Sequence, residues 1–220
     1  MGRNLSSNSE PYLFTNFNEV LLEDAGASWY NPKELGGISS RKLDERSFLI
    51  DFLGIRRNPL LPLKIKLGKQ WGWKDPRNTF TLNYWRKNYF PRARVLHIYR
   101  NGIDVALSLK KRNEKLADTA RTEELSDFSS CFRLWERYVE QAISLKKNTD
   151  IEQLHISYEK LINGDRSTIT DLEHFLNAKN IPALINKISV KSSMNKSLES
   201  LTEEEILITK QSKMMAALGY

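Results

Sequence analysis

The sequence predicts an α/β fold in which a parallel sheet is flanked by helices. Strand-like and helical segments alternate along the 220 residues, and helical stretches of roughly 10 to 20 residues suit right-handed crossovers between parallel strands. The segment RVLHIYR, residues 94–100, is short, mostly apolar and bounded by turn residues, which is typical of an interior strand of a parallel sheet. The length suits one good-sized domain, so we expect residues 1–220 to form a single domain.

The first half of the chain predicts helices separated by turn-rich segments. Apolar side chains recur at helical spacing in residues 14–26 and again in residues 39–54, so each segment is expected to form a helix. The short apolar stretch at the start of residues 71–77 predicts a strand that runs into a turn at a proline. Residues 79–90 predict a further helix, which stops before Pro91.

The second half repeats the alternation of strand and helix. After the strand at residues 94–100, the expected elements are helix 102–116, a long amphipathic helix from about residue 126 to 148, strand 151–158, a turn and helix over residues 159–177, and helix 201–220. The last helix begins with a capping box, because Thr202 is followed three residues later by Glu205.

Composition limits the classes of function and the compartment. The formal net charge is +7, which favours anionic partners such as phosphates or sulfates. The single cysteine, Cys131, excludes an internal disulfide and suits a reducing compartment, so we expect a cytoplasmic protein. The apolar runs are shorter than the roughly 20 residues that a membrane span needs, so no membrane association is expected.

The stretch VLHIYRNGIDVALSLKKR, residues 95–112, carries the strongest chemical signal. Arg100 ends a predicted parallel strand, and ligands bind beyond the carboxyl ends of such strands. The following helix begins beside it, so free backbone N–H groups and the positive end of the helix dipole face the same space. A guanidinium there suits a phosphate, and Ser108 lies two turns into that helix. The alternative is that Arg100 only pairs with a carboxylate of the fold.

Four ordered segments of the chain together resemble sulfotransferases that use 3′-phosphoadenosine-5′-phosphosulfate, particularly the bacterial type. They are FNEVLLEDAGASWYNP, KDPR followed by YWRKNYFPRARVLHIYRNGIDVALSLKKR, FRLWERYVEQA and ISYEKLINGDRSTITDLEHFLN, and the ending LGY is also typical. The resemblance implies a P-loop-like sulfotransferase fold. It implies 3′-phosphoadenosine-5′-phosphosulfate as co-substrate, with a small molecule or carbohydrate as acceptor.

The resemblance also implies roles for individual residues. Arg100 and Ser108 match the family's arginine and serine that bind the 3′-phosphate of the co-substrate, and their spacing agrees without a gap. Tyr158 matches the tyrosine that approaches the adenine. The Gly102 of this chain stands where the family commonly has proline.

The chain departs from the family pattern at its start. The family begins with a strand and a Gly/Ser/Thr-rich loop whose backbone N–H groups cradle the 5′-phosphosulfate, and residues 1–14 show no such loop after an apolar strand. We therefore expect an N-terminally truncated form of the fold. Two hypotheses stay open: a sulfotransferase that is incomplete or inactive, or a non-catalytic sulfotransferase-like remnant that binds a nucleotide or polyanion.

The candidate catalytic residues follow from the chemistry of sulfuryl transfer. Such a transfer needs positive charge near the departing oxygens and a base for the acceptor proton. Lys74 is a candidate for the bridging oxygen, and Asp75 is a candidate for the base or a cap of the turn before Pro76. Arg77 is a candidate anion contact in the co-substrate site. Many family members have histidine where this chain has Pro76, so the base is not assigned.

Other classes of function have less support in the sequence. No histidine or cysteine spacing indicates a metal site, and the family needs no metal for transfer. A nucleic-acid-binding protein would carry aromatic residues interleaved with arginine on one sheet face, and no zinc-finger, RRM or helix-turn-helix pattern supports that class. A nucleotide kinase would carry the phosphate-loop motif G-x-x-x-x-G-K-(S/T), which is also absent. The acceptor and the oligomeric state are left open.

Overall fold

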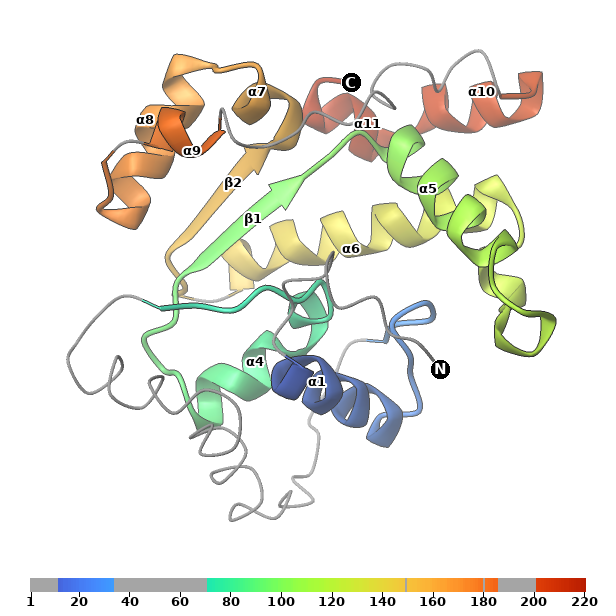
Figure 1. The fold of residues 1–220 in the computed structure, drawn as a ribbon, viewed down its shortest axis with the longest axis horizontal. Helices are drawn as coiled ribbons and strands as arrows, with labels where there is room; N and C mark the ends of the chain where they lie inside the picture. The colour runs from blue at the N-terminus through green and yellow to red at the C-terminus, as the bar shows by residue number, and fades with distance from the viewer. Residues whose placement is uncertain (1–11, 34–70, 149, 180, 186–200) are drawn as a thin grey trace. The chain divides into compact units, whose positions relative to one another are not determined.

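The computed structural model describes residues 12–33, 71–148, 150–179, 181–185 and 201–220 (Figure 1). The chain divides into two compact units, Met1–Pro91 and Arg92–Tyr220, which are treated separately below. The single domain expected for residues 1–220 stays a prediction. The helix expected at residues 39–54 lies outside the described residues.

Unit 1 contains two of the predicted helices and an aromatic core. They are α1 (Tyr12–Asp24) and α4 (Asn78–Asn88), which lie within two residues of the expected starts. The buried core consists of Phe14, Phe17, Leu21 and Trp85. Buried aromatic rings remove a large apolar area from water, so they contribute much of the packing energy of this cluster of described residues.

The strand expected at the start of residues 71–77 is wrong, because residues 71–75 form no regular secondary structure, whereas the turn expected at Pro76 is confirmed. The indole of Trp73 stacks on Phe14 with the ring centroids 4.3 Å apart, and Trp71 lies 5.7 Å from Trp73. The segment is therefore held by aromatic packing onto the core, whereas a strand is held by a hydrogen-bonded ladder.

Unit 2 is built on two parallel strands, β1 (Val95–Tyr99) and β2 (Gln153–Ser157), which pair in register from Val95 with Gln153 to Tyr99 with Ser157. Both predicted strands are confirmed, with shorter bounds. The arrowheads of β1 and β2 point the same way in Figure 1, so the segments that leave their carboxyl ends start at the same edge of the sheet. The combination of helices with a parallel sheet confirms the α/β class that the sequence predicts.

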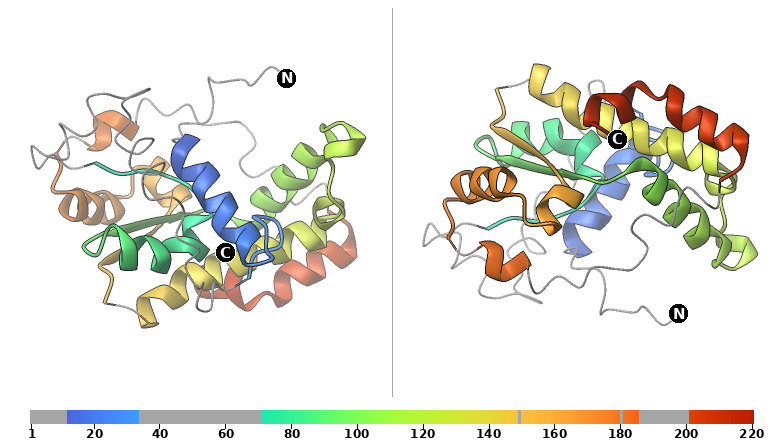
Figure 2. Two further views of the ribbon diagram at one scale, coloured as in Figure 1. Left: turned by 90° about the horizontal axis from the view of Figure 1, so that it is seen from below. Right: turned by 90° about the horizontal axis from the view of Figure 1, so that it is seen from above.

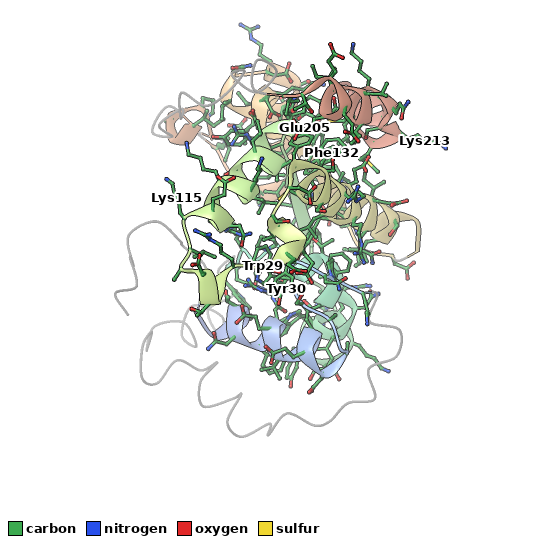
Figure 3. The ribbon with its side chains drawn as sticks, turned by 90° about the vertical axis from the view of Figure 1, so that its right-hand side faces the viewer. Trp29, Tyr30, Lys115, Phe132, Glu205 and Lys213 are labelled. Carbon is green, nitrogen blue, oxygen red and sulfur yellow. The ribbon has the colours of Figure 1, made fainter. Side chains whose placement is uncertain are left out.

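Seven helices and two 3₁₀ turns complete the described part of unit 2. They are α5 (Gly102–Glu114), η1 (Asp118–Ala120), η2 (Glu123–Leu125), α6 (Phe128–Asn148), α7 (Tyr158–Ile162), α8 (Arg166–Leu176), α9 (Ile181–Ile185), α10 (Glu203–Gln211) and α11 (Lys213–Leu218). Helices α5, α10 and α11 pack along α6 (Figure 2). Phe132 of α6 is fully buried, whereas Lys115, just after α5, and Lys213 of α11 are exposed (Figure 3).

The helix expected at residues 201–220 is broken in two at Ser212, which ends α10 and caps α11. The hydroxyl of Ser212 donates to Glu136 Oε1 at 2.5 Å and accepts from the backbone N–H of Met215 at 3.1 Å. A contact with α6, 76 residues away, therefore fixes the break. The capping box of Thr202 and Glu205 is confirmed. The turn expected after β2 also contains the short helix α7.

Two histidines meet across the sheet. His97 and His155 are register partners, and their Nδ1 atoms lie 2.9 Å apart. Burial, and then the neighbouring His155, lower the pKa of His97 from 6.5 to about 4. On the other face, Leu96, Leu154 and Ile156 pack against the apolar cluster of α8 and α9. The sheet is therefore apolar on one face and carries the imidazole pair on the other.

Candidate functional site

The candidate site in unit 2 lies where β1 and β2 end. Arg100 directly follows β1, and Tyr158 directly follows β2. The guanidinium carbon of Arg100 lies 5.7 Å from the centroid of the Tyr158 ring, which is a cation–π distance. The structure thus brings together two of the residues that the sequence predicts in the co-substrate site, although 58 residues separate them in the chain.

The guanidinium of Arg100 also pairs with an acid of the next helix. Its Nη2 lies 2.7 Å from Asp104 Oδ2, and the side chains are 27% and 7% exposed, respectively. The Nε atom of Arg100 is buried and has no hydrogen-bond partner. A guanidinium has five N–H donors in a fixed plane, so the single bond to Asp104 leaves donors for an anion while it fixes the orientation of the group.

The turn between β1 and α5 is tightly packed. A Cβ atom added to Gly102 would lie 2.6 Å from Cε3 of Trp135, closer than real Cβ contacts come. Trp135 is a buried, rigid ring, so only glycine lets α5 begin so close to α6. Any residue with a Cβ atom, proline included, would meet the same ring at this position.

A side-chain cap begins α5 beside Arg100. Asn101 Oδ1 accepts from the backbone N–H of Ile103 at 2.9 Å, and Asp104 lies in the first helical turn. The cap satisfies one of the unpaired N–H groups at the helix start. The predicted strand, turn and helix are therefore present at this point, with the helix beginning at Gly102.

Ser108 lies in the middle of α5 and is exposed. It follows Gly102 by six residues, which is about 9 Å along the helix axis at roughly 1.5 Å per residue. The structure places it on the helix that begins beside Arg100. Its role in binding the same phosphate stays a prediction.

The remaining candidates lie in unit 1, around a buried carboxylate. The side chain of Asp75 is fully buried. Its Oδ2 accepts from Nδ2 of Asn18 at 2.9 Å, and its Oδ1 accepts from both the backbone N–H and Nη1 of Arg77, each at 3.0 Å. The two bonds to Arg77 span Pro76, as expected if Asp75 caps the turn before that proline. Its role as a base stays a prediction.

Arg77 is held by two acids. Besides Asp75, its Nη2 pairs with Glu19 Oε1 at 2.7 Å, and the Arg77 side chain is 14% exposed. An anion at Arg77 would therefore compete with carboxylates already in place. Lys74 is exposed and lies one residue before the buried acid.

Asn18 is a polar centre of unit 1 that the sequence did not indicate. It is fully buried, its Oδ1 accepts from Thr81 Oγ1 at 2.6 Å and Trp85 Nε1 at 2.7 Å, and its Nδ2 donates to Asp75. A buried amide needs all of these partners. Its place in α1, one turn after Phe14 on the core-facing side, is the signal that could have located it.

Comparison with known proteins supports a family assignment. A family model described as the sulfotransferase family matches residues 15–181, a range that includes every candidate residue named above. No curated protein and no solved structure matches the chain. Within the described ranges, no group of three or more His, Cys, Asp or Glu side chains is placed to hold a metal ion. In the same ranges, no helix has the length and apolar character needed to cross a membrane.

Proposed function

Since the chain belongs to the sulfotransferase family, we propose that it transfers a sulfuryl group from 3′-phosphoadenosine-5′-phosphosulfate to a hydroxyl or amine of a small molecule or carbohydrate. The observation that carries this proposal is the contact of Arg100 with Tyr158 at the carboxyl edge of two adjacent parallel strands. This is the edge at which open α/β sheets bind nucleotides.

Within this proposal, Arg100 binds the 3′-phosphate of the co-substrate and Tyr158 lies against its adenine. The residues fit these tasks. Arg100 is a fixed cation with a buried Nε that lacks a protein partner, and charged groups of this kind bind phosphate through two parallel hydrogen bonds. An aromatic ring provides a flat face for a base. Ser108 would add a hydroxyl to the same phosphate.

For the chemical step, we assign Lys74 to the bridging oxygen that leaves the sulfuryl group. Sulfuryl transfer is expected to resemble phosphoryl transfer, in which little is needed beyond positioning and positive charge at the departing oxygens. Lys74 is exposed, and its side chain carries the positive charge that this step needs. Arg77 would supply a further cationic contact, limited by its pairs with Glu19 and Asp75.

The acceptor proton needs a base, and Asp75 is the candidate that the sequence offers. The hydrogen bonds of Asp75 to Asn18 and Arg77 favour a structural role in the ground state. A base would have to exchange one of these bonds for the acceptor hydroxyl. The two roles differ in what the loss of the carboxylate changes: the stability of the fold for a structural acid, and turnover for a base.

The second candidate function is a non-catalytic domain that binds the nucleotide without turnover. The observation that favours it is the engagement of Arg100 and Asp75 by groups of the protein itself. The lack of a phosphosulfate loop, the N-terminal truncation and the cytoplasmic location expected from the sequence stay predictions. Residues 1–11 lie outside the described ranges.

A turnover experiment separates the two candidates. The purified full chain is mixed with 3′-phosphoadenosine-5′-phosphosulfate and a panel of phenols, sugars and amines, and release of adenosine 3′,5′-bisphosphate is measured by chromatography. We expect release that depends on an acceptor and falls at least tenfold in Lys74→Ala. The matched control is Lys87→Ala, another exposed lysine of unit 1. Nucleotide binding without any release would support the non-catalytic domain instead.

A further inference from the structure

Glu159 links the segments that follow the two strands, and the proposed function gives it no role. It is the second residue of α7 and directly follows Tyr158. Its Oε1 accepts from the backbone N–H of Asn101 at 2.9 Å, so a carboxylate that follows β2 contacts the turn that follows β1. Its Oε2 accepts from Ser157 Oγ at 2.9 Å and from the hydroxyl of Tyr220 at 2.5 Å.

The bond to Asn101 fixes one half of a single peptide group. The peptide that joins Arg100 to Asn101 has two polar atoms, the carbonyl oxygen of Arg100 and the N–H of Asn101. Trp135 Nε1 donates to that carbonyl at 3.1 Å, and Glu159 accepts from that N–H. Because both atoms are held from different elements, the plane of this peptide cannot rotate freely, and the direction in which the Arg100 side chain leaves the backbone is set.

A carboxylate beside a phosphate site would normally weaken anion binding by repulsion. Here three donors share the charge of Glu159, namely the Asn101 N–H and the hydroxyls of Ser157 and Tyr220. Burial, and then the hydrogen bond to Glu159, raise the pKa of Tyr220, so the phenol stays a donor at neutral pH. The carboxylate can therefore act on the turn through hydrogen bonds while its negative charge is partly neutralised.

We propose that Glu159 is a positioning residue for nucleotide binding, which acts through Arg100 by holding the Arg100–Asn101 peptide together with Trp135. It does not itself contact the nucleotide. This inference rests on the proposed function, since it assumes that Arg100 and Tyr158 bind the nucleotide. It adds that the pairing of Arg100 with Tyr158 depends on a residue of α7, the helix that follows β2.

The test is the affinity of the full chain for adenosine 3′,5′-bisphosphate by titration calorimetry, with thermal unfolding of every variant. Glu159→Ala leaves the Asn101 N–H without its acceptor, and we expect binding to weaken about tenfold. Glu159→Gln keeps an oxygen for that N–H, so we expect binding within about threefold of the wild type. Glu173→Ala is the matched control, because Glu173 Oε1 also accepts a backbone N–H, that of Ile181 at 3.3 Å, within the α8–α9 pair.

Repeating the Glu159→Ala measurement in a protein that already carries Arg100→Ala shows whether Glu159 acts through Arg100. In Arg100→Ala, we expect Glu159→Ala to change the affinity less than twofold, because the group that it positions is gone. Wild-type affinity in Glu159→Ala, or an equal loss of affinity in both backgrounds, would overturn the positioning role and leave the proposed function intact. If the wild type does not bind the bisphosphate, the proposed function fails, and this inference fails with it.

Discussion

Arg100 lies over the ring of Tyr158, with its guanidinium carbon 5.7 Å from the ring centroid. The two residues are the first after β1 and β2, respectively, so the parallel register of the strands sets their approach. We proposed that this pair binds a nucleotide, with the cation on a phosphate and the ring against the base.

The first prediction concerns the ring of Tyr158. Tyr158→Phe keeps the aromatic face, so its affinity for adenosine 3′,5′-bisphosphate should stay within about threefold of the wild type. Tyr158→Leu loses both the stacking surface and the cation–π contact, and affinity should fall by about 1 to 3 kcal/mol. Titration calorimetry measures both. Equal affinity in Tyr158→Leu and the wild type would show that the ring does not contact the base.

The second prediction concerns the packing of Gly102 against Trp135. Gly102→Ala places a Cβ 2.6 Å from Cε3 of Trp135, and we expect a loss of about 1 to 3 kcal/mol in the free energy of unfolding. Gly72→Ala is the control, since a Cβ there meets nothing within 4 Å. Urea unfolding of both variants checks the prediction. A similar change in the two variants would contradict the close approach.

The third prediction concerns the pH dependence that the histidine pair gives to stability. The pKa of His97 is lowered from 6.5 to about 4 in the folded protein, so the unfolded chain binds the proton more strongly. The stability contributed by neutral His97 is present above about pH 6.5 and is lost as the pH falls through 4, on the order of 3 kcal/mol in total. Between pH 7 and pH 5, His97→Gln should therefore lose less stability than the wild type.

Chemical denaturation at several pH values measures this dependence. His174→Gln is the control for His97→Gln, because it makes the same change at a histidine that is exposed on α8. An unchanged slope in His97→Gln would mean that the pair does not lower the stability in acid.

The fourth prediction separates the two roles of Asp75. As a structural acid, it caps the turn at Pro76 and holds Arg77 and Asn18. Asp75→Ala would then cost about 1 to 3 kcal/mol of unfolding free energy, because Asn18 and the backbone N–H of Arg77 lose their acceptor while the Arg77 guanidinium keeps Glu19. If Asp75 is instead the base, Asp75→Asn should lose turnover with little change in unfolding free energy or in nucleotide affinity. Denaturation, calorimetry and turnover of Asp75→Asn together decide between the roles.

The sequence predicted the strand, turn and helix around Arg100 because each part has a local cause. An apolar run gives β1, Asn101 caps the next helix, and apolar spacing continues through α5. The pairing of Arg100 with Asp104 could also have been predicted from the sequence. Their spacing of four residues is that of a helical ion pair, although Arg100 precedes the helix by two residues.

The features that the sequence could not predict depend on distant residues. The strand expected at Trp71 and Trp73 is absent because their indoles pack on Phe14, more than 50 residues away. The break at Ser212 depends on Glu136 of α6. The contact of Glu159 with the Asn101 N–H spans 58 residues. Apolar patterns and capping residues report local structure only, and such partners carry no local signal.

The most direct measurement is the affinity of the full chain for adenosine 3′,5′-bisphosphate in the wild type, Arg100→Ala and Arg94→Ala. The control is closely matched: Arg94 precedes β1, lies 4.9 Å from the Phe175 ring centroid and pairs with Glu152, at the opposite end of the strand. We predict that Arg100→Ala weakens binding by about 1.5 to 3 kcal/mol, whereas Arg94→Ala leaves it within about twofold. Equal affinities in Arg100→Ala and the wild type would contradict the account.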